Sequence, residues 1–196
     1  MALNETQTEN SLPGTPHWEL SNPAINREIE GYASLTSVNK GKSIDFCVST
    51  NDSNFQIEVY RTGWYDGVGA RLLQTIPNLP GKLQATPSPD PITGLIECHW
   101  TTSCTLAVPT TWTSGIFLAR LTASTSHKQS YIIFVVRDDE RDAALFYQLS
   151  INTYQAYNFW PGELMGNPFT TGLQANALGR FLSIVLTYWG IATNRA

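Results

Sequence analysis

The chain has 196 residues, a net charge of -4 and 14% charged residues. This balance gives no sign of the large basic surface that nucleic acids and anionic membranes require, so neither is an expected partner. Six Trp, eight Tyr and eight Phe residues favour a β-rich core, because aromatic side chains pack well on pleated sheets. The first residues lack the basic and apolar regions of a secretory signal, which makes a cytoplasmic location the default expectation.

Residues 1–16 are polar, contain two prolines and are expected to form an extended lead-in. Two stretches farther along, "SIDFCVS" (43–49) and "FQIEVY" (55–60), alternate apolar residues with polar or small ones. A period of two buries one face of a β-sheet, so both are predicted strands. Turn-forming residues, "TNDSN", separate them, and the two strands are therefore expected to form a hairpin.

Similar runs predict six further strands at 29–35, 70–76, 94–100, 103–108, 115–123 and 130–137. Many short strands separated by turn-forming residues are typical of a two-sheet antiparallel sandwich. The segment "PNLPGKLQATPSPDPITG" (77–94) holds five of the eleven prolines. We expect it to be a long surface loop, because proline cannot donate a hydrogen bond in the middle of a sheet.

The charged run "DDERD" (138–142) separates the last predicted strand from "AALFYQLSI", which is almost continuously apolar. Such an apolar run is typical of a strand that is buried on both faces in a parallel α/β sheet. We therefore expect a β-sandwich domain over 17–137 and the start of an α/β core over 138–196. The later apolar segment "FLSIVLTYWGIA" is shorter than the roughly 20 residues that a helix needs to cross a bilayer.

Two groups of residues could carry chemistry. "ECHWTTSC" brings together Cys98, His99 and Cys104, but their spacing fits no common zinc pattern, and a strand-turn-strand with buried thiols is favoured. "YRTGWYDGVGARL" (60–72) combines aromatic residues, two arginines and three glycines that suggest positive φ angles or close backbone approach. It fits a platform for a sugar or a partner protein, or a structural corner in which an arginine donates to loop carbonyls; the corner is favoured. No G-x-S-x-G elbow is present, which argues against a hydrolase triad.

Several long strings carry a family resemblance: "ENSLPGTPHWEL", "IEGYASLTSVNKGKSIDFCVST", "FQIEVYRTGWYDGVGARL" and "TYQAYNFWPGEL". In order and spacing the chain resembles proteins related to the large (β) subunit of N,N-dimethylformamidase, in its N-terminal part, from about residue 9 to 164. The resemblance implies a mainly β chain, with an immunoglobulin-like antiparallel β-sandwich followed by an incomplete α/β segment like the core of glutamine amidotransferases. It also implies hydrolysis of small N-substituted amides at a single iron bound by two tyrosines and a glutamate, with a small subunit or a homo-oligomer as partners.

Carried over to this sequence, the resemblance gives Tyr157 of "TYQAYN" as a metal ligand, with Tyr154 as the alternative. Tyrosinate and carboxylate are hard oxygen donors that suit ferric iron, and such a metal polarises an amide carbonyl and lowers the pKa of bound water. A tyrosine in an aromatic loop also serves as a packing residue. The second tyrosine and the glutamate match no position in this chain.

Residues 160–166, "WPGELMG", stand where relatives carry a serine and a tyrosine, and the sequence beyond them resembles no family string. We therefore expect a truncated or frameshifted member that binds no iron and is inactive alone. The alternative is a non-catalytic β-sandwich module for binding or assembly.

Overall fold

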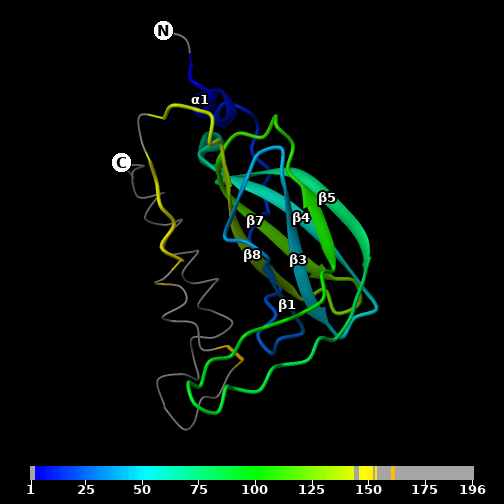
Figure 1. Cartoon of the computed structure of the whole chain (residues 1–196). Coiled ribbons are helices and arrows are strands. Elements are labelled where there is room, and N and C mark those ends of the chain that lie inside the picture. Colours follow the sequence, from blue (N-terminus) through cyan, green and yellow to red (C-terminus); the bar gives the residue numbers. More distant parts are fainter. Residues whose placement is uncertain (1–2, 144–145, 152, 154–159, 162–196) are drawn as a thin grey trace, which may run out of the picture.

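The structure, a computed structural model, describes residues 3–143, 146–151, 153 and 160–161. Figure 1 shows a body of β-strands with a short helix near one end. The elements are α1 (Glu5–Asn10), β1 (Ile29–Ala33), β2 (Ser37–Asn39), β3 (Ser43–Thr50), β4 (Asn54–Thr62), the 3-10 helix η1 (Tyr65–Gly67), β5 (Ala70–Pro80), β6 (Cys104–Ala107), β7 (Gly115–Ala123) and β8 (Gln129–Arg137). Most of the predicted α/β segment, 138–196, lies outside the described residues. Within the described part of the chain, no helix has the length and apolarity needed to cross a membrane.

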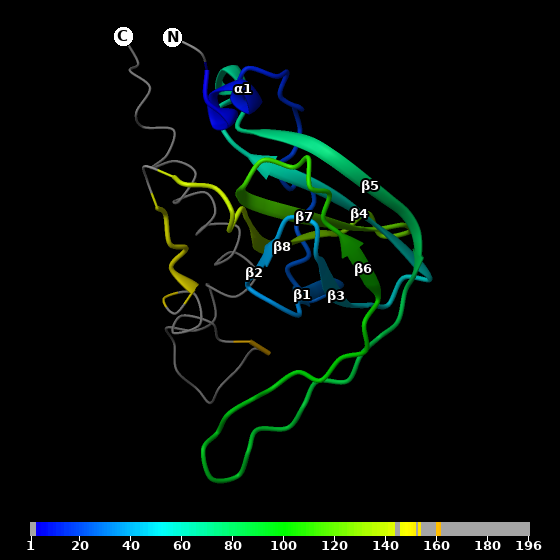
Figure 2. The ribbon, with the colours of Figure 1, turned by 45° about the horizontal axis from the view of Figure 1, so that its top comes forward.

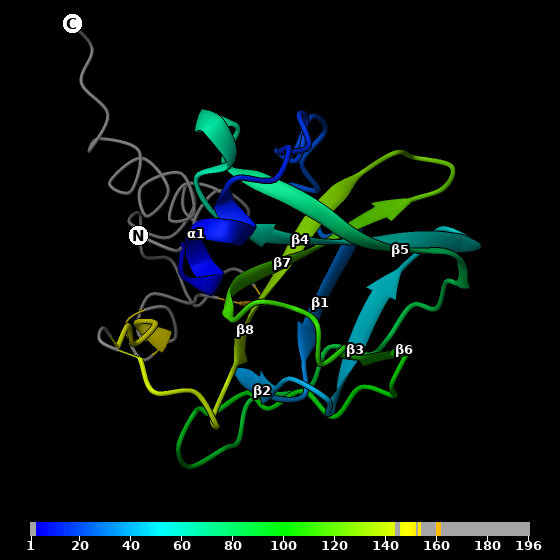
Figure 3. The same cartoon turned by 90° about the horizontal axis from the view of Figure 1, so that it is seen from above.

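The strands form two sheets, which Figure 3 separates when the molecule is seen from above. The small sheet has the order β1-β3-β6, and the large sheet has the order β2-β8-β7-β4-β5. The paired strands are antiparallel, except that β2 runs parallel to β8. The mainly β sandwich predicted from the sequence is therefore confirmed.

The core lies between the two sheets. Phe46 of the small sheet meets Phe134 of the large sheet edge to face, with ring centroids 5.5 Å apart. Phe134 also lies 5.5 Å from Phe117, on which Trp112 stacks at 5.2 Å. The alternation of the two predicted strands is confirmed by six buried residues, Ile44, Phe46, Val48, Phe55, Ile57 and Val59. Each such side chain stabilises the fold by about 1.5–3 kcal/mol relative to an exposed position.

The predicted hairpin between 43–49 and 55–60 is wrong. β3 pairs with β1 and β6, whereas β4 pairs with β5 and β7. The chain therefore crosses from one sheet to the other at the turn between these strands. Alternation shows which face of a strand is buried. Two strands bury the same faces whether they pair in one hairpin or lie in two facing sheets, so the pattern alone does not select the neighbouring strand.

The proline-rich connection begins later than predicted, because β5 continues to Pro80 rather than ending at 76. Pro77 and Pro80 are tolerated there because β5 is an edge strand of the large sheet. The predicted strand 94–100 forms no regular element. It belongs to the long loop 81–103, which Figure 2 shows extending away from the body of the sandwich.

The lead-in 1–16 contains α1 and is not extended throughout. Asn4 begins the helix with a capping box: its side chain accepts from the Gln7 amide at 2.9 Å, and the Gln7 side chain accepts from the Asn4 amide at 3.0 Å. After the helix, the chain lies against the large sheet, where the Trp18 indole donates to the Val68 carbonyl at 2.8 Å. Trp18 and Leu20 pack against Tyr60, Leu118 and Tyr131, so the N-terminal segment covers part of the face of that sheet that points away from the main core.

Candidate functional site

Tyr157, the predicted metal ligand, and Tyr154, its alternative, lie outside the residues that the structure describes. Trp160 and Pro161 are described and stand at the end of the segment "TYQAYNFWP" (153–161), which we call the tyrosine motif. Their contacts with the sandwich show where this end of the motif lies. We call the group formed by Arg27, Glu30, Trp100 and Trp160 the Trp160 site.

Three sandwich side chains contact the Trp160 indole. Its Nε1 donates to Glu30 Oε2 at 2.9 Å, and the Arg27 guanidinium lies over its ring, 5.0 Å from the centroid. The Trp100 ring meets it edge to face, with centroids 5.9 Å apart. Arg27 Nη1 also donates to the Pro161 carbonyl at 3.3 Å. The indole is therefore held at its polar edge, over its ring and beside a second aromatic ring.

One carboxylate connects these contacts. Glu30 accepts from Arg27 Nη2 at 2.8 Å and from Arg27 Nε at 3.1 Å, in addition to the Trp160 indole. The Glu30 side chain is 17% exposed and that of Arg27 is 38% exposed. A pair this accessible contributes about 0–1 kcal/mol to stability, so its main effect is to fix the direction of both groups.

Strand alternation places Glu30 and Tyr32 on the same face of β1, which points away from the core. The Tyr32 hydroxyl donates to the Cys98 carbonyl at 3.1 Å and accepts from the Trp100 amide at 3.0 Å. The Trp100 indole donates to the Ala85 carbonyl at 2.8 Å. The returning arm of the long loop is thereby attached both to β1 and to its own outgoing arm.

Gln84, buried at 7% exposure, attaches the loop to β3. Its backbone amide donates to Ser49 Oγ, and its side-chain amide donates to the carbonyls of Val48 and Thr101, all at 3.0 Å. Its side-chain oxygen accepts from the Thr101 amide at 2.7 Å. The loop therefore covers the face of the small sheet that the alternation pattern assigns to the polar side, and Ser49 is buried beneath it.

The three cysteines are free thiols in the structure. Burial raises the pKa of the Cys98 and Cys104 thiols, which keeps both protonated near neutral pH. Cys104 begins β6, whereas Cys98 and His99 lie in the long loop, so the predicted strand-turn-strand is wrong in its first strand. Among the described residues, no three His, Cys, Asp or Glu side chains are grouped so that they could hold a metal ion.

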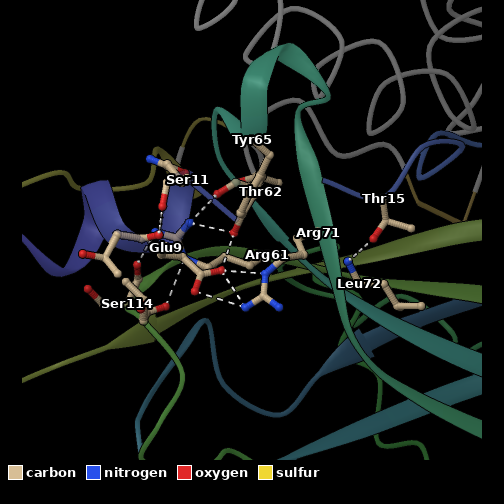
Figure 4. Close-up of polar contacts among 12 residues, drawn as sticks. Glu9, Ser11, Thr15, Arg61, Thr62, Tyr65, Arg71, Leu72 and Ser114 are labelled. Atoms are coloured by element: carbon tan, nitrogen blue, oxygen red, sulfur yellow. Dashed lines mark hydrogen bonds and ion pairs between the residues drawn. The ribbon is translucent and has the colours of Figure 1, made fainter. Parts of the chain in front are cut away.

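The corner between β4 and β5 is the structural arrangement favoured from the sequence. Arg61, 3% exposed, donates to the carbonyls of Thr113 at 3.1 Å and Ser114 at 3.0 Å. It also donates to the Tyr65 hydroxyl at 3.0 Å, and this hydroxyl donates to Glu9 at 2.8 Å. Figure 4 shows these side chains converging below η1. The arginine is thus fully engaged inside the protein and is not part of an open platform.

Glu9 joins α1 to this corner. Its carboxylate accepts from Arg71 Nε at 2.9 Å and Nη2 at 3.1 Å, and the neighbouring Asn10 side chain accepts from the Trp64 amide at 3.1 Å. Burial raises the pKa of Tyr65, which keeps its hydroxyl protonated and able to donate to Glu9. Sequence reasoning missed Glu9 because the lead-in was expected to be extended. The capping box around Asn4 was the signal that could have revealed the helix.

Two of the three corner glycines have the predicted positive φ, Gly67 at 84° and Gly69 at 97°. Gly63 serves a different purpose. A Cβ at Gly63 would lie 2.3 Å from Asn10 Oδ1, so the glycine allows α1 to approach the corner.

Comparison with known proteins bears on the sandwich from β4 onward and on the segment that contains Tyr157 and Trp160. The family described as N,N-dimethylformamidase beta subunit-like, C-terminal, matches residues 56–187, about two thirds of the chain. The chain belongs to this family. The match to the dimethylformamidase family continues past residue 164, where the resemblance of the sequence strings stops. Its description refers to the C-terminal part of the β subunit, whereas the strings indicated the N-terminal part.

No curated protein sequence matches the chain. Among solved structures, an AA10 lytic polysaccharide monooxygenase (LPMO) from Streptomyces lividans is similar, with 18% sequence identity and a TM-score of 0.29. The aligned region covers 52% of this chain and 57% of that chain. A similarity this weak does not bear on the fold or the function.

Proposed function

We propose that this protein takes part in the hydrolysis of small N-substituted amides, as a dimethylformamidase-type amide hydrolase in which Tyr157 is an iron ligand. The observation that carries the proposal is that the family match extends from residue 56, in β4, to residue 187 and so includes the strands β5 to β8 and the position of Tyr157. In the reaction, the amide C–N bond breaks, the oxygen of water bonds to the carbonyl carbon, and the amine leaves with a proton. The products are a carboxylic acid and an amine.

Within this proposal, Tyr157 is the residue of this chain that would hold the iron, with Tyr154 as the alternative. A ferric ion prefers oxygen donors of this kind, and when bound it supplies polarisation of the amide carbonyl and a more acidic water. The role of the sandwich is to bind and orient the end of the motif through Glu30, Arg27 and Trp100. The second tyrosine and the glutamate match no position in this sequence, so we propose that the chain is inactive alone.

A hybrid enzyme tests this function. Residues 1–164 of this chain would replace the corresponding region of an intact, active dimethylformamidase, and release of dimethylamine from N,N-dimethylformamide would be measured. We expect the hybrid to be active and Tyr157→Phe to lower kcat at least about 100-fold, the usual scale for removing one electrostatic contributor to catalysis. Tyr147→Phe, in an exposed tyrosine before the motif, is the matched control and should retain activity. Equal activity of the two variants would exclude the proposed role of Tyr157.

One observation favours the alternative, an assembly module. Ile92, at the tip of the long loop, is 92% exposed. The tip is ordered by Asp90, whose side chain accepts from the amides of Ile92 at 3.0 Å and Thr93 at 2.7 Å. A turn that is already ordered loses less conformational entropy when its exposed apolar residue contacts a partner protein. A second copy or a small subunit are the partners implied by the family resemblance.

The alternative has its own measurement. Sedimentation of the full chain, alone and mixed with a candidate small subunit, would be compared with that of Ile92→Ser. Under the assembly proposal, the wild-type chain forms a complex without metal and Ile92→Ser weakens it. A chain that stays monomeric in both mixtures would rule this proposal out.

A further inference from the structure

We propose that Glu30, Arg27 and Trp100 form a positioning site that binds Trp160 and so fixes the end of the tyrosine motif on the sandwich. The link to Tyr157 rests on the proposed function, whereas the contact with Trp160 does not. The three sandwich residues are positioning residues and not catalytic ones, because they act through Trp160.

The site is chemically selective for an indole. Glu30 Oε2 accepts the Nε1 hydrogen, which neither phenylalanine nor leucine possesses. The guanidinium of Arg27 lies over the same ring, where the electron-rich face of tryptophan attracts a cation more strongly than other aromatic rings do. Trp100 adds an edge-to-face contact. These three interactions use three different properties of one side chain, which is what a specific attachment point requires.

The sandwich holds this site in place from several directions. Arg27 Nη2 donates to Thr86 Oγ1 at 2.9 Å, and Trp100 is fixed by Tyr32 through its amide and by Ala85 through its indole. Arg27 adopts a φ of 63°, in the left-handed region that a side chain enters at a cost of about 1–2 kcal/mol. The surrounding structure therefore holds the Arg27 backbone in this conformation. From this backbone position the side chain reaches Glu30 and Trp160.

These contacts join parts of the chain that are far apart. Glu30 and Trp160 are separated by 130 positions, and Arg27 and Pro161 by 134. Near residue 140, the segment after β8 has its own links, including Arg141 to Glu5 at 3.1 Å. The Trp160 site holds this segment at a second point, some 20 residues farther along the sequence. The chain after β8 is therefore attached to the rest of the protein at two separate described points, Arg141 and Trp160.

The large sheet supplies a matched control. Arg120 pairs with Glu58 at 2.6 Å and lies over the Tyr60 ring, 5.2 Å from its centroid. This group repeats the arginine, glutamate and aromatic arrangement of the Trp160 site, but it does not involve Trp160. A substitution of Glu58 therefore shows how losing the glutamate of an arginine–glutamate–aromatic group affects the protein when the contacts of Trp160 are left intact.

The test uses the full chain with ¹⁵N-labelled tryptophan. The Trp160 indole N–H signal is assigned from Trp160→Phe, and its hydrogen-exchange rate is measured. We expect Glu30→Ala to accelerate exchange at least about tenfold, which corresponds to losing a hydrogen bond to a charged group. Glu30→Gln keeps an acceptor oxygen and should restore most of the protection, and Glu58→Ala should leave it unchanged. The Trp18 indole, bonded to the Val68 carbonyl, monitors the fold in the variants of the Trp160 site.

The outcomes separate the two proposals. Unchanged Trp160 exchange in Glu30→Ala, with Trp18 still protected, overturns the positioning site whatever the activity of the hybrid enzyme. If Glu30→Ala unfolds the chain, Trp100→Leu is used in its place and is expected to accelerate Trp160 exchange. Unchanged Trp160 exchange in Trp100→Leu would also overturn the positioning site. In the hybrid, Glu30→Ala should lower kcat roughly 10-fold to 100-fold with little change in KM, and Glu30→Gln should recover it. Accelerated exchange in a hybrid without activity would instead reject the proposed function and keep the attachment.

Discussion

The buried cluster at the β4–β5 corner makes a quantitative prediction for Tyr65→Phe. The substitution removes one hydroxyl that accepts from Arg61 at 3.0 Å and donates to Glu9 at 2.8 Å. The ring remains, so the change creates no large cavity and the apolar packing of a fully buried side chain is kept. The loss therefore comes from the two hydrogen bonds, each to a charged partner.

A hydrogen bond to a charged group is worth about 1.5–3 kcal/mol. The cost here is lower than twice that range, because neither charge loses all its partners. Glu9 keeps two bonds from Arg71, and Arg61 keeps the carbonyls of Thr113 and Ser114. Removing a whole partner from a buried ion pair would cost about 3–5 kcal/mol. We expect Tyr65→Phe to lower the free energy of unfolding by about 2 kcal/mol.

Urea unfolding checks this value, with an unchanged m-value as evidence that the unfolded state is the same. The midpoint temperature should fall by about 4–8 °C for a chain of this size. Tyr60→Phe is the control, because its hydroxyl makes a long contact of 3.3 Å with Glu58 and should cost less than about 1 kcal/mol. Equal losses in the two variants would refute the reasoning. In a double-mutant cycle of Glu9→Ala and Tyr65→Phe, the two losses of unfolding free energy should differ from additivity by about 1 kcal/mol.

Four further predictions concern turns and titration. Gly81→Ala would bring a Cβ within 1.9 Å of the Asp52 carbonyl oxygen, so it should cost about 2–3 kcal/mol in urea unfolding. Gly94→Ala, with no atom within 4 Å and a φ of 70°, should cost about 1 kcal/mol. Hydrogen bonds from the Ser126 and Thr125 amides hold the pKa of Asp52 below its usual value. The ionised carboxylate therefore stabilises the fold at neutral pH, and this contribution is lost on acidification. The difference in unfolding free energy between wild type and Asp52→Ala should shrink below about pH 4. Burial raises the pKa of Tyr60 to about 12, so its neutral form stabilises the fold up to the unfolded pKa of about 10, and this contribution is lost as the pH rises to 12. Alkaline unfolding of Tyr60→Phe should therefore show a shallower loss of stability than wild type across this window.

The sequence predicts the sandwich well because burial leaves a period-two signal in each long strand. The apolar faces of β3 and β4 follow directly from the spacing of residues such as Phe46 and Ile57. The pairing of these strands does not follow, because facing strands and neighbouring strands bury the same residues. The short β2 has too few residues for a pattern to be visible.

The contacts of the candidate site were beyond sequence reasoning for a different reason. Glu30 appears in the sequence as an ordinary outward residue of a strand, and nothing near it indicates a partner 130 positions away. Residues 77–94 were expected to be a surface loop and Trp100 to end a strand, yet Gln84 and Tyr32 attach the long loop 81–103 to the small sheet through side chains. Side-chain hydrogen bonds of this kind leave no periodic pattern. Tyr157 came from family resemblance and stays a prediction.

The most direct test of the proposed function is the visible spectrum of the hybrid enzyme after loading with ferric iron. A tyrosinate bound to ferric iron gives a charge-transfer band. We predict that the band is present in the hybrid and in Tyr147→Phe, and that Tyr157→Phe weakens or removes it. A hybrid that stays colourless, or a band that persists unchanged in Tyr157→Phe, would contradict the assignment of Tyr157 as an iron ligand.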